Sequence, residues 1–281
     1  GNYHSDQQIN SLYTYGQFSY KDMFFLDFTA RNDWSSILPV ANNSFLYPSV
    51  TGSALISDIF PVLKENKINF LKIRGSWAKV GSTGALGAYS LNQTYGLSNS
   101  GFGNQASVPN TQFNPNLKAE MVTSIEFGID AKMFNNRLRF SATYYDAQSE
   151  DLLLPIQVTA ATGFTNVWDN IADMSNKGIE LQLGGTLIKK EDFSFDVDLN
   201  FAKNNNEVTS LGGLDTYVLG GQWGLSLEAR PGQPYGSLIG RDFERTDSGE
   251  VIYENGLPKI DSSQKIIGNI APDWTGGANF S

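Results

Sequence analysis

Flat aromatic side chains stand beside hydrogen-bonding groups in two polar segments of the second half of the chain. Recognition of a sugar or a peptide from water uses this combination, because a ring face packs on C–H groups while polar groups orient the ligand. The candidate ligand-binding residues are Trp168, Asp169, Asn170, Tyr217, Trp223, Arg230 and Asp242. The alternative is that the tryptophans hold loops together or contact a partner protein.

Catalytic chemistry finds little support in the residue types. Ser35, Ser36 and Ser124 have no imidazole to activate them, because the single histidine, His4, lies in a polar stretch near the start. Carboxylate pairs such as Glu126 with Asp130 could serve glycoside hydrolysis, but nothing distinguishes one pair from the many others. We therefore expect no catalytic residues and no enzyme activity.

Metal, cofactor and nucleic-acid sites are also not indicated. The chain has no cysteine, and its glycine pairs follow no phosphate-binding pattern. Asp247, Glu250 and Asp261 could hold calcium in a loop, but their spacing matches no calcium-loop signature. With 20 Lys and Arg against 29 Asp and Glu, the net charge of −9 argues against a nucleic-acid partner. We expect no metal and no cofactor.

The elements that position these residues show strict alternation of apolar and polar side chains. In the segment 177–187, Ile179, Leu181 and Leu183 fall on one face and Glu180 and Gln182 on the other. A period of two puts each set on one side of a β-strand. We expect the Leu181 and Leu183 face to contact lipid and the Gln182 face to line a wet interior.

Four hairpins of this kind follow one another. Their predicted strands are 9–20 and 23–31 (turning at Lys21-Asp22), 49–57 and 70–80, 121–133 and 137–147, and 177–187 and 193–203. Long polar connections follow every second strand, over about 32–48, 81–119, 148–176 and the stretch before Trp274. The connection 58–69 is expected to hold one helical turn over Phe60 to Lys64. Strands of about 9–11 residues, short turns at one end and long loops at the other are typical of a transmembrane β-barrel.

The fold class is therefore all-β, part of a large antiparallel transmembrane β-barrel with short periplasmic turns and long extracellular loops. No apolar run is long enough for a membrane-crossing helix. Neither end of the chain resembles a natural terminus, so we expect a fragment of a longer chain. The alternative from another class is a soluble or surface-attached β-sandwich that binds carbohydrate without transport.

Six segments in order resemble one protein family. They are Arg31–Ser36, Leu71–Trp77, Asn114–Glu120 with Thr123, Glu126, Gly128 and Asp130, Asn176–Glu180, Pro231–Ser237 with Gly240, and Ile267–Gly277. The third resembles the strand entry of TonB-dependent outer-membrane receptors, and the others are similar to the SusC/RagA branch of Bacteroidetes-type bacteria. Each motif alone is weak, and the ordered set spans nearly the whole chain.

The resemblance implies that residues 1–281 form a partial receptor barrel of the roughly 22-strand class, without the plug domain and the final strands. It implies TonB-dependent import of a large nutrient across the bacterial outer membrane, with a glycan or oligosaccharide as the expected cargo and a peptide as the alternative. The implied partners are a SusD-like surface lipoprotein, the TonB complex acting through the missing plug, and the lipids and lipopolysaccharide of the bilayer.

Overall fold

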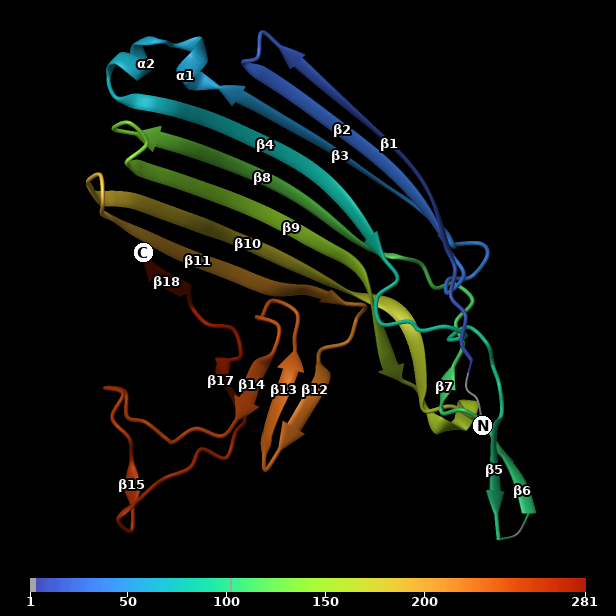
Figure 1. The fold of residues 1–281 in the computed structure, drawn as a ribbon. Helices are drawn as coiled ribbons and strands as arrows, with labels where there is room; N and C mark the ends of the chain where they lie inside the picture. Colours follow the sequence, from blue (N-terminus) through green and yellow to red (C-terminus); the bar gives the residue numbers. More distant parts are fainter. Residues whose placement is uncertain (1–3, 102) are drawn as a thin grey trace.

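A curved sheet dominates the computed structural model, which describes residues 4–101 and 103–281 (Figure 1). Nine antiparallel strands follow one another in the order β1-β2-β3-β4-β8-β9-β10-β11-β18. Their bounds are β1 Ile9–Tyr20, β2 Phe24–Ser35, β3 Ser44–Leu55, β4 Ile68–Ser82, β8 Glu120–Met133, β9 Leu138–Gln157, β10 Asn166–Lys189, β11 Ser194–Leu211 and β18 Thr275–Phe280. A short strand, β7 (Thr111–Gln112), pairs with β10 in parallel.

The connections divide between two ends of this sheet. Residues 21–23, 56–67, 134–137 and 190–193 form the turn end, and residues 36–43, 83–101, 103–119, 158–165 and 212–274 form the loop end. Lys21 and Asp22 both have positive φ, as do Asn135 and Asn136, which is the conformation that tight type I′ hairpin turns require. The predicted helical turn is two one-turn helices, α1 (Ile56–Ile59) and α2 (Val62–Glu65).

Two predicted long connections are much shorter in the structure. The predicted connection 148–176 consists mostly of strand, because β9 runs on to Gln157 and β10 starts at Asn166. The predicted connection 32–48 likewise shrinks to residues 36–43. Backbone pairing continues here without apolar alternation, because no single face lies in lipid and Leu152, Leu153 and Leu154 pack on apolar clusters of the loop end. The prediction that longer connections share one end of the sheet is confirmed.

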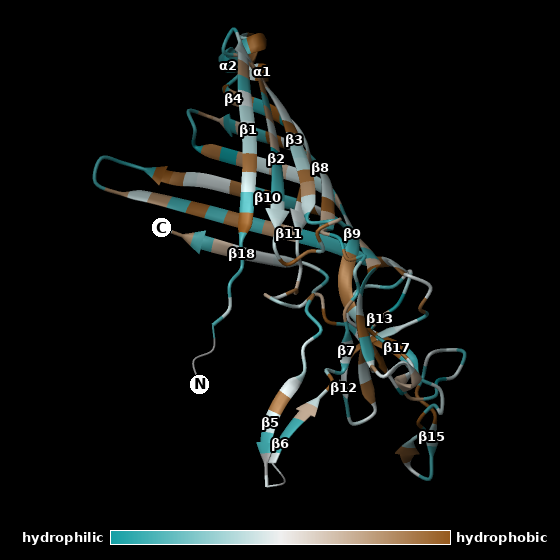
Figure 2. Ribbon diagram, turned by 90° about the vertical axis from the view of Figure 1, so that its right-hand side faces the viewer, coloured by the Kyte–Doolittle hydropathy of each residue, from teal (hydrophilic) through white to brown (hydrophobic). Residues whose placement is uncertain are grey.

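The two faces of the sheet differ in chemistry, as the alternation predicts. We call a set of register partners on neighbouring strands a ladder row. One row presents apolar side chains on what we name the outward face: Ala54, Ile73, Ile129, Ala142, Leu181 and Phe201. The next row presents polar ones on the inward face: Lys72, Asp130, Ser141, Gln182 and Asn200. Figure 2 shows the resulting alternation of hydrophobic and hydrophilic segments along β10 and β11.

A single outward row passes from apolar to polar as it crosses the sheet. Its members are Phe28, Val50, Trp77 and Ile125 on β2, β3, β4 and β8, and then Asp146, Lys177 and Asn205 on β9, β10 and β11. Asp146 and Lys177 form an ion pair of 3.0 Å. The apolar band therefore slides along the strands, as it must if tilted strands cross a flat slab of lipid.

The slide gives an estimate of the tilt. The first polar outward residue is Asn32 on β2, four residues from Phe28 toward the loop end, and Lys203 on β11, two residues from Asn205 toward the turn end. This shift of six residues is about 20 Å along the strands over six strand-to-strand steps of about 29 Å in total, which corresponds to a tilt of about 35°. Transmembrane barrels have strand tilts in this range.

The remaining elements lie at the loop end. A small antiparallel sheet contains β12 (Tyr217–Gln222), β13 (Leu225–Ala229), β14 (Ser237–Gly240) and β17 (Lys265–Asn269). Two short hairpins pair β5 (Gly96–Ser100) with β6 (Gly103–Ser107) and β15 (Tyr253–Glu254) with β16 (Leu257–Pro258), and residues Ala160–Thr162 form a 3-10 turn, η1. The main sheet is one curved layer (Figure 1), so the β-sandwich alternative is wrong.

No helix among the described residues has the length and apolar character needed to cross a membrane. The buried apolar residues gather instead at the loop end, in two clusters. The first joins the loops to β9 through Ile37, Leu38, Leu86, Leu117, Ala119 and Leu153, and the second joins β10, β11 and β13 through Ala172, Val208, Leu211 and Ala229.

Substitution of neighbouring residues on β10 tests the face assignment. Leu183, which is 43% exposed and lies at the middle of the outward apolar stretch of β10, should not tolerate a charge. Leu183→Arg is expected to lower the free energy of unfolding in lipid vesicles by about 2–4 kcal/mol, as lipid-facing arginines near the bilayer centre do.

The matched control is Gln182→Arg, which places the same charge one residue away on the inward face, opposite Ser141 and Asn200. Its free energy of unfolding should stay close to that of the unsubstituted protein. Equal losses from the two substitutions would contradict the orientation of the sheet.

Candidate functional site

Asparagine side chains clamp the segment before β8 onto β10 at the loop end. Asn170 donates from Nδ2 to the carbonyl oxygens of Lys118 (3.0 Å) and Asp151 (2.6 Å), and its Oδ1 accepts from the Lys118 N–H (3.0 Å). Asn114 donates from Nδ2 to the Trp168 carbonyl and to Asp169 Oδ1, both at 3.1 Å. The Asn114–Glu120 motif is therefore fixed to the same three residues that the sequence marks as ligand-binding.

The first apolar cluster lies beneath this clamp. Leu117 is fully buried in it, and Trp168 packs against it while partly buried. Asn42, from the 36–43 loop, donates to the carbonyl oxygens of Asn116 and Leu117 at 3.1 Å. Trp168 thus packs where the 36–43 and 83–119 connections meet β9.

The small sheet is anchored to β11 by the Pro231–Ser237 motif. Val208 exchanges backbone hydrogen bonds with this segment, donating to the Gln233 carbonyl (2.9 Å) and accepting from the Gly232 N–H (2.8 Å). The Tyr235 N–H donates to Asn206 Oδ1 at 2.8 Å. Tyr217 adds a hydroxyl bond of 3.2 Å to the Pro155 carbonyl on β9. The small sheet is consequently held against the wall strands.

A buried carboxylate organises the interior of the small sheet. Glu228 accepts hydrogen bonds from Ser226 Oγ (2.5 Å), Thr216 Oγ1 (2.8 Å) and Arg230 Nε (2.8 Å). These donors, with the Ser226 hydroxyl first among them, lower the pKa of Glu228 in spite of its burial. The Arg230 guanidinium, a predicted ligand contact, is thereby paired inside the fold.

Trp223 stands at the tip of the β12–β13 hairpin and is 96% exposed. It borders a hollow of about 600 Å³ that we name the Trp223 hollow. Asp242 lies in the same hollow, where the Phe243 N–H and Arg245 lower the pKa of its carboxyl. The hollow is lined by Trp223, Gly224, Leu225, Gly240, Arg241, Asp242, Phe243, Ile260, Gln264 and Ile267.

A second hollow at the loop end was missed by the sequence analysis. It measures about 680 Å³, we name it the Tyr89 hollow, and it is lined by Asp6, Gln7, Gln8, Ser36, Tyr89, Leu91 and Asn92. The Asp6 N–H donates to the Tyr89 hydroxyl oxygen across 83 positions of sequence (3.1 Å). An aromatic residue in a polar loop was the available signal, but no local pattern brings these two segments together.

The seven predicted ligand-binding residues therefore fall into separate places. Trp168, Asp169 and Asn170 belong to the clamp, Tyr217 and Arg230 bond within the fold, and Trp223 and Asp242 share an open hollow. Figure 1 shows that the N-terminal end of β10, which carries the clamp, and the β12–β13 hairpin both lie at the loop end. Trp223 and Asp242 are the two whose side chains are best placed to meet a ligand.

The calcium alternative gains no support from the geometry. The described residues contain no group of three or more His, Cys, Asp or Glu side chains placed to hold a metal ion. Asp261 instead accepts from the Ser263 N–H (2.9 Å) and pairs with Lys265, and these contacts, Lys265 foremost, hold the pKa of its carboxyl well below its usual range.

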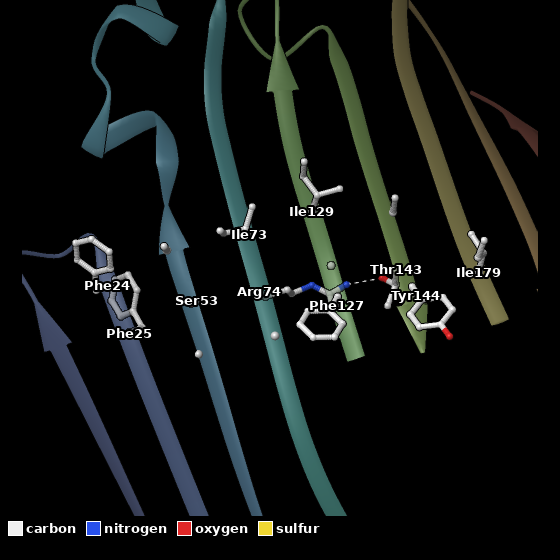
Figure 3. Close-up of a pocket in the computed structure, with 15 residues that line it drawn as sticks. Phe24, Phe25, Ser53, Ile73, Arg74, Phe127, Ile129, Thr143, Tyr144 and Ile179 are labelled. Carbon is white, nitrogen blue, oxygen red and sulfur yellow. Dashed lines mark hydrogen bonds between the residues drawn. The ribbon is translucent and has the colours of Figure 1, made fainter. Parts of the chain in front are cut away.

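A third hollow, of about 760 Å³, lies over the outward face. Small residues on neighbouring strands (Gly52, Ala54, Gly75 and Ala142) leave the space of this hollow. Larger apolar side chains surround it (Figure 3): Phe24, Ile73, Phe127, Ile129, Tyr144 and Ile179. It is part of the apolar band, so its expected contact is lipid.

Arg74, also labelled in Figure 3, shows how charge is kept on the other face. Its guanidinium donates to Thr143 Oγ1 at 2.6 Å and lies 3.4 Å from Asp130. To reach Thr143 it crosses Gly128, where a Cβ would come within 2.5 Å of Arg74 Cζ. Gly128 thus leaves room for the Arg74 side chain, which pairs with Asp130 on β8 and reaches Thr143 on β9.

Comparison with known proteins adds a family. A family model described as "TonB dependent receptor-like, beta-barrel" matches residues 1–278. TonB-dependent receptor P26 of Formosa agariphila is 30% identical over 218 residues, which is 75% of this chain and 22% of that receptor. TonB-dependent receptor SusC of Bacteroides thetaiotaomicron is 28% identical over 216 residues, 73% of this chain and 22% of SusC.

Among solved structures, that of the RagAB peptide transporter is similar with a TM-score of 0.83 and 25% identity, covering 98% of this chain and 32% of that one. The chain thus spans less than a third of the length of each of these relatives.

Loss of the hydrogen bonds made by Asn170, one of the two asparagines of the clamp, should increase the mobility of the segment before β8. Asn170→Ala removes three hydrogen bonds at about 1 kcal/mol each. Trypsin should then cut after Lys118 much faster than in the unsubstituted protein. Asn166→Ala is the control, because that side chain donates only to its neighbour Thr165 Oγ1. Equal cleavage of the Asn170 variant and the unsubstituted protein would contradict the clamp.

The small sheet should weaken in acid. Because the pKa of Glu228 is lowered from 4.5, its charge stabilises the fold fully above pH 4.5, and this contribution is lost as pH falls through the lower folded-state pKa. Hydrogen-exchange protection of β12 and β13 amides is expected to fall in that range. Glu228→Gln should flatten the dependence, and an unchanged acid profile in this variant would assign it to other groups.

Proposed function

The chain belongs to the TonB-dependent receptor-like β-barrel family, whose members lie in the bacterial outer membrane, and we propose that it forms part of the wall and mouth of a nutrient importer. One observation carries the proposal most directly. The loop end holds two hollows with aromatic and hydrogen-bonding linings at the end of a sheet whose inward face is polar. A cargo that binds there from outside would next meet a polar path.

The proposed cargo is a glycan or oligosaccharide too large for simple pores. The Trp223 hollow offers an exposed indole face, and the Tyr89 hollow offers a phenol beside the amides of Gln7, Gln8 and Asn92. Asp242 and Arg245 in this region face each other at 3.6 Å and offset each other's charge, which leaves Arg241 as the remaining charged residue of the lining. Flat faces with neutral hydrogen-bonding groups suit sugar rings.

A peptide cargo is the second candidate, and a specific observation favours it. The solved structure reported above as similar, at a TM-score of 0.83, is that of a peptide transporter. Peptides also use aromatic and amide contacts, and their charged ends would require unpaired charged side chains at the site.

The proposal extends to partners and to the rest of the receptor. The sheet has two open edges, β1 and β18, whose unpaired backbone groups lipid does not tolerate. We therefore propose that further strands and a plug complete the barrel, that a SusD-like surface lipoprotein covers its mouth, and that TonB acts through the plug. The outward apolar band would contact lipid, including lipopolysaccharide.

The proposal assigns transport and no catalysis to this chain. The family is one of receptors and transporters, and several inward carboxylates are paired with cations, as Arg74 with Asp130 and Arg139 with Asp198 illustrate. A pair of this kind has neither a free carboxylate nor a free acid to offer a substrate.

Binding by the purified full-length receptor tests the site. Trp223→Ala should weaken binding of the transported oligosaccharide by about five- to twentyfold, the loss of one stacked aromatic face. Tyr253→Ala is the control, since Tyr253 is 66% exposed on β15 and does not line the Trp223 hollow. Equal binding by the Trp223 variant and the unsubstituted receptor would remove the hollow from the cargo site.

The same assay separates the two cargo classes. Oligosaccharides are expected to bind and to support growth only when the receptor is present. A receptor that binds peptides and no oligosaccharide would overturn the glycan assignment in favour of the second candidate.

A further inference from the structure

Three flat side chains lie side by side on the inward face of β1, β2 and β3. Tyr13 is the register partner of Arg31, and Arg31 is the partner of Tyr47. Neighbouring strands are about 4.8 Å apart, so the three groups form one continuous surface. Tyr15 extends this surface on the same face, two residues nearer the turn end, beside Thr29 and Ser49. We name these four residues, Tyr13, Tyr15, Arg31 and Tyr47, the inward aromatic patch.

The orientation of the patch follows from the register. Tyr13 and Tyr15 alternate with Thr14 and Gly16, whose partners Ala30 and Phe28 belong to the outward apolar band. The two tyrosines therefore point away from lipid. They are nevertheless 71% and 76% exposed, and neither belongs to the two apolar clusters of the described residues. Their rings are therefore open to a molecule on the inward side of the sheet.

Hydrogen bonds hold the rest of the patch rigid. Arg31 donates from Nε to Asp33 Oδ1 at 2.8 Å and from an Nη to Ser11 Oγ at 2.9 Å. The Tyr47 hydroxyl donates to Asp33 Oδ2 at 2.6 Å, and the guanidinium lies 5.8 Å from the centre of the Tyr47 ring. The charges of Arg31 and Asp33 compensate each other, so the surface presents flat faces without net charge.

The height of the patch places it at the mouth of the interior. The Tyr13 row lies between the row of Ala30 and the row of Asn32, where the outward face of β2 becomes polar. It is therefore level with the outer edge of the apolar band. A molecule that leaves the loop-end hollows for the interior passes this level.

We propose that the inward aromatic patch is a second cargo-binding site, on which sugar rings of the transported glycan stack after they leave the outer hollows. This inference rests on the proposed function. The chemistry favours sugar rings, which offer a C–H face to Tyr13, Tyr15 and Tyr47 and hydroxyl edges to nearby polar groups. Those groups are Ser11, Gln17, Thr29 and Ser49, with Thr29 and Ser49 already 2.7 Å apart.

The test uses the full-length receptor in detergent and fluorophore-labelled oligosaccharides released from α-glucan, β-glucan and mannan, with a labelled peptide pool alongside. Replacing both exposed tyrosines (Tyr13→Ala with Tyr15→Ala) should weaken oligosaccharide binding by at least about tenfold, because two stacking faces are lost. The conservative pair, Tyr13→Phe with Tyr15→Phe, keeps the faces and should bind within about threefold of the unsubstituted receptor.

The matched control replaces aromatic residues on the outward face of the same strand, Phe18→Ala with Tyr20→Ala. These are 62% exposed each, and their loss should leave binding unchanged. Unchanged binding in the Tyr13 and Tyr15 alanine pair would overturn the inference, and so would an equal loss in the outward control. If the double variant no longer migrates as a folded barrel on unheated gels, Tyr15→Ala alone replaces it, with a loss of at least about threefold expected and unchanged binding again overturning the inference.

The failure of the proposed function has its own signature. An unsubstituted receptor that binds peptides and none of the oligosaccharides would overturn the glycan import, and the patch inference with it. A receptor that binds oligosaccharides equally well with and without Tyr13 and Tyr15 would overturn the patch alone.

Discussion

Backbone pairing in the absence of water is the constraint on which the rest of the structure depends. A lipid-exposed N–H or C=O group has no partner except a neighbouring strand. The register is therefore unbroken along the middle of the strands, as from Phe24 to Trp34 on β2. Irregularities lie toward the strand ends: register shifts between Ile68 and Phe70 on β4 and between Thr186 and Ile188 on β10 lie near the turn end, and β10 shifts register between Asn170 and Met174 at the loop end, where Asp151 takes a positive φ. Water there can satisfy what the ladder leaves unpaired, so the chain can bend and carry the clamp.

The same constraint explains how much of the fold could be predicted. Alternation reports two different solvents on two faces, so the hairpins and the inward position of Gln182 were predictable from sequence, as was the turn at Lys21 and Asp22. From Asp146 to Asp151 on β9 the side chains are mostly polar on both faces, and Leu152, Leu153 and Leu154 then follow one another without alternation, so the pattern disappears although pairing continues to Gln157. The small sheet was missed for a similar reason, since its strands have only four to six residues and little alternation.

The site was predictable in composition but not in arrangement. Trp168 and Trp223 both lie in segments that the sequence marked as polar connections, yet one packs on a buried cluster and the other is almost fully exposed. The difference comes from partners far away in sequence: Asn114 bonds next to Trp168 across 54 positions, and nothing comparable covers the β12–β13 tip. Likewise, the Asn114–Glu120 motif that resembles the family is an architectural element, because its hydrogen bonds to Trp168, Asp169 and Asn170 fix where the loops lie.

Because the strands are tilted, the members of one ladder row lie at different heights relative to the bilayer on successive strands. Along the Phe28 row, the members on β2 to β8 lie at the level of the lipid and those on β9 to β11 lie beyond it, although the register is the same. Its inward counterpart, from Lys72 through Asp130 to Gln182 and Asn200, climbs in the same way around the interior. Groups at one height therefore come from different rows on successive strands. Side chains of one row are therefore arranged along a helical path around the interior. A cargo moving straight down the interior contacts successive strands one after another, and it does not meet one closed ring of side chains from a single row.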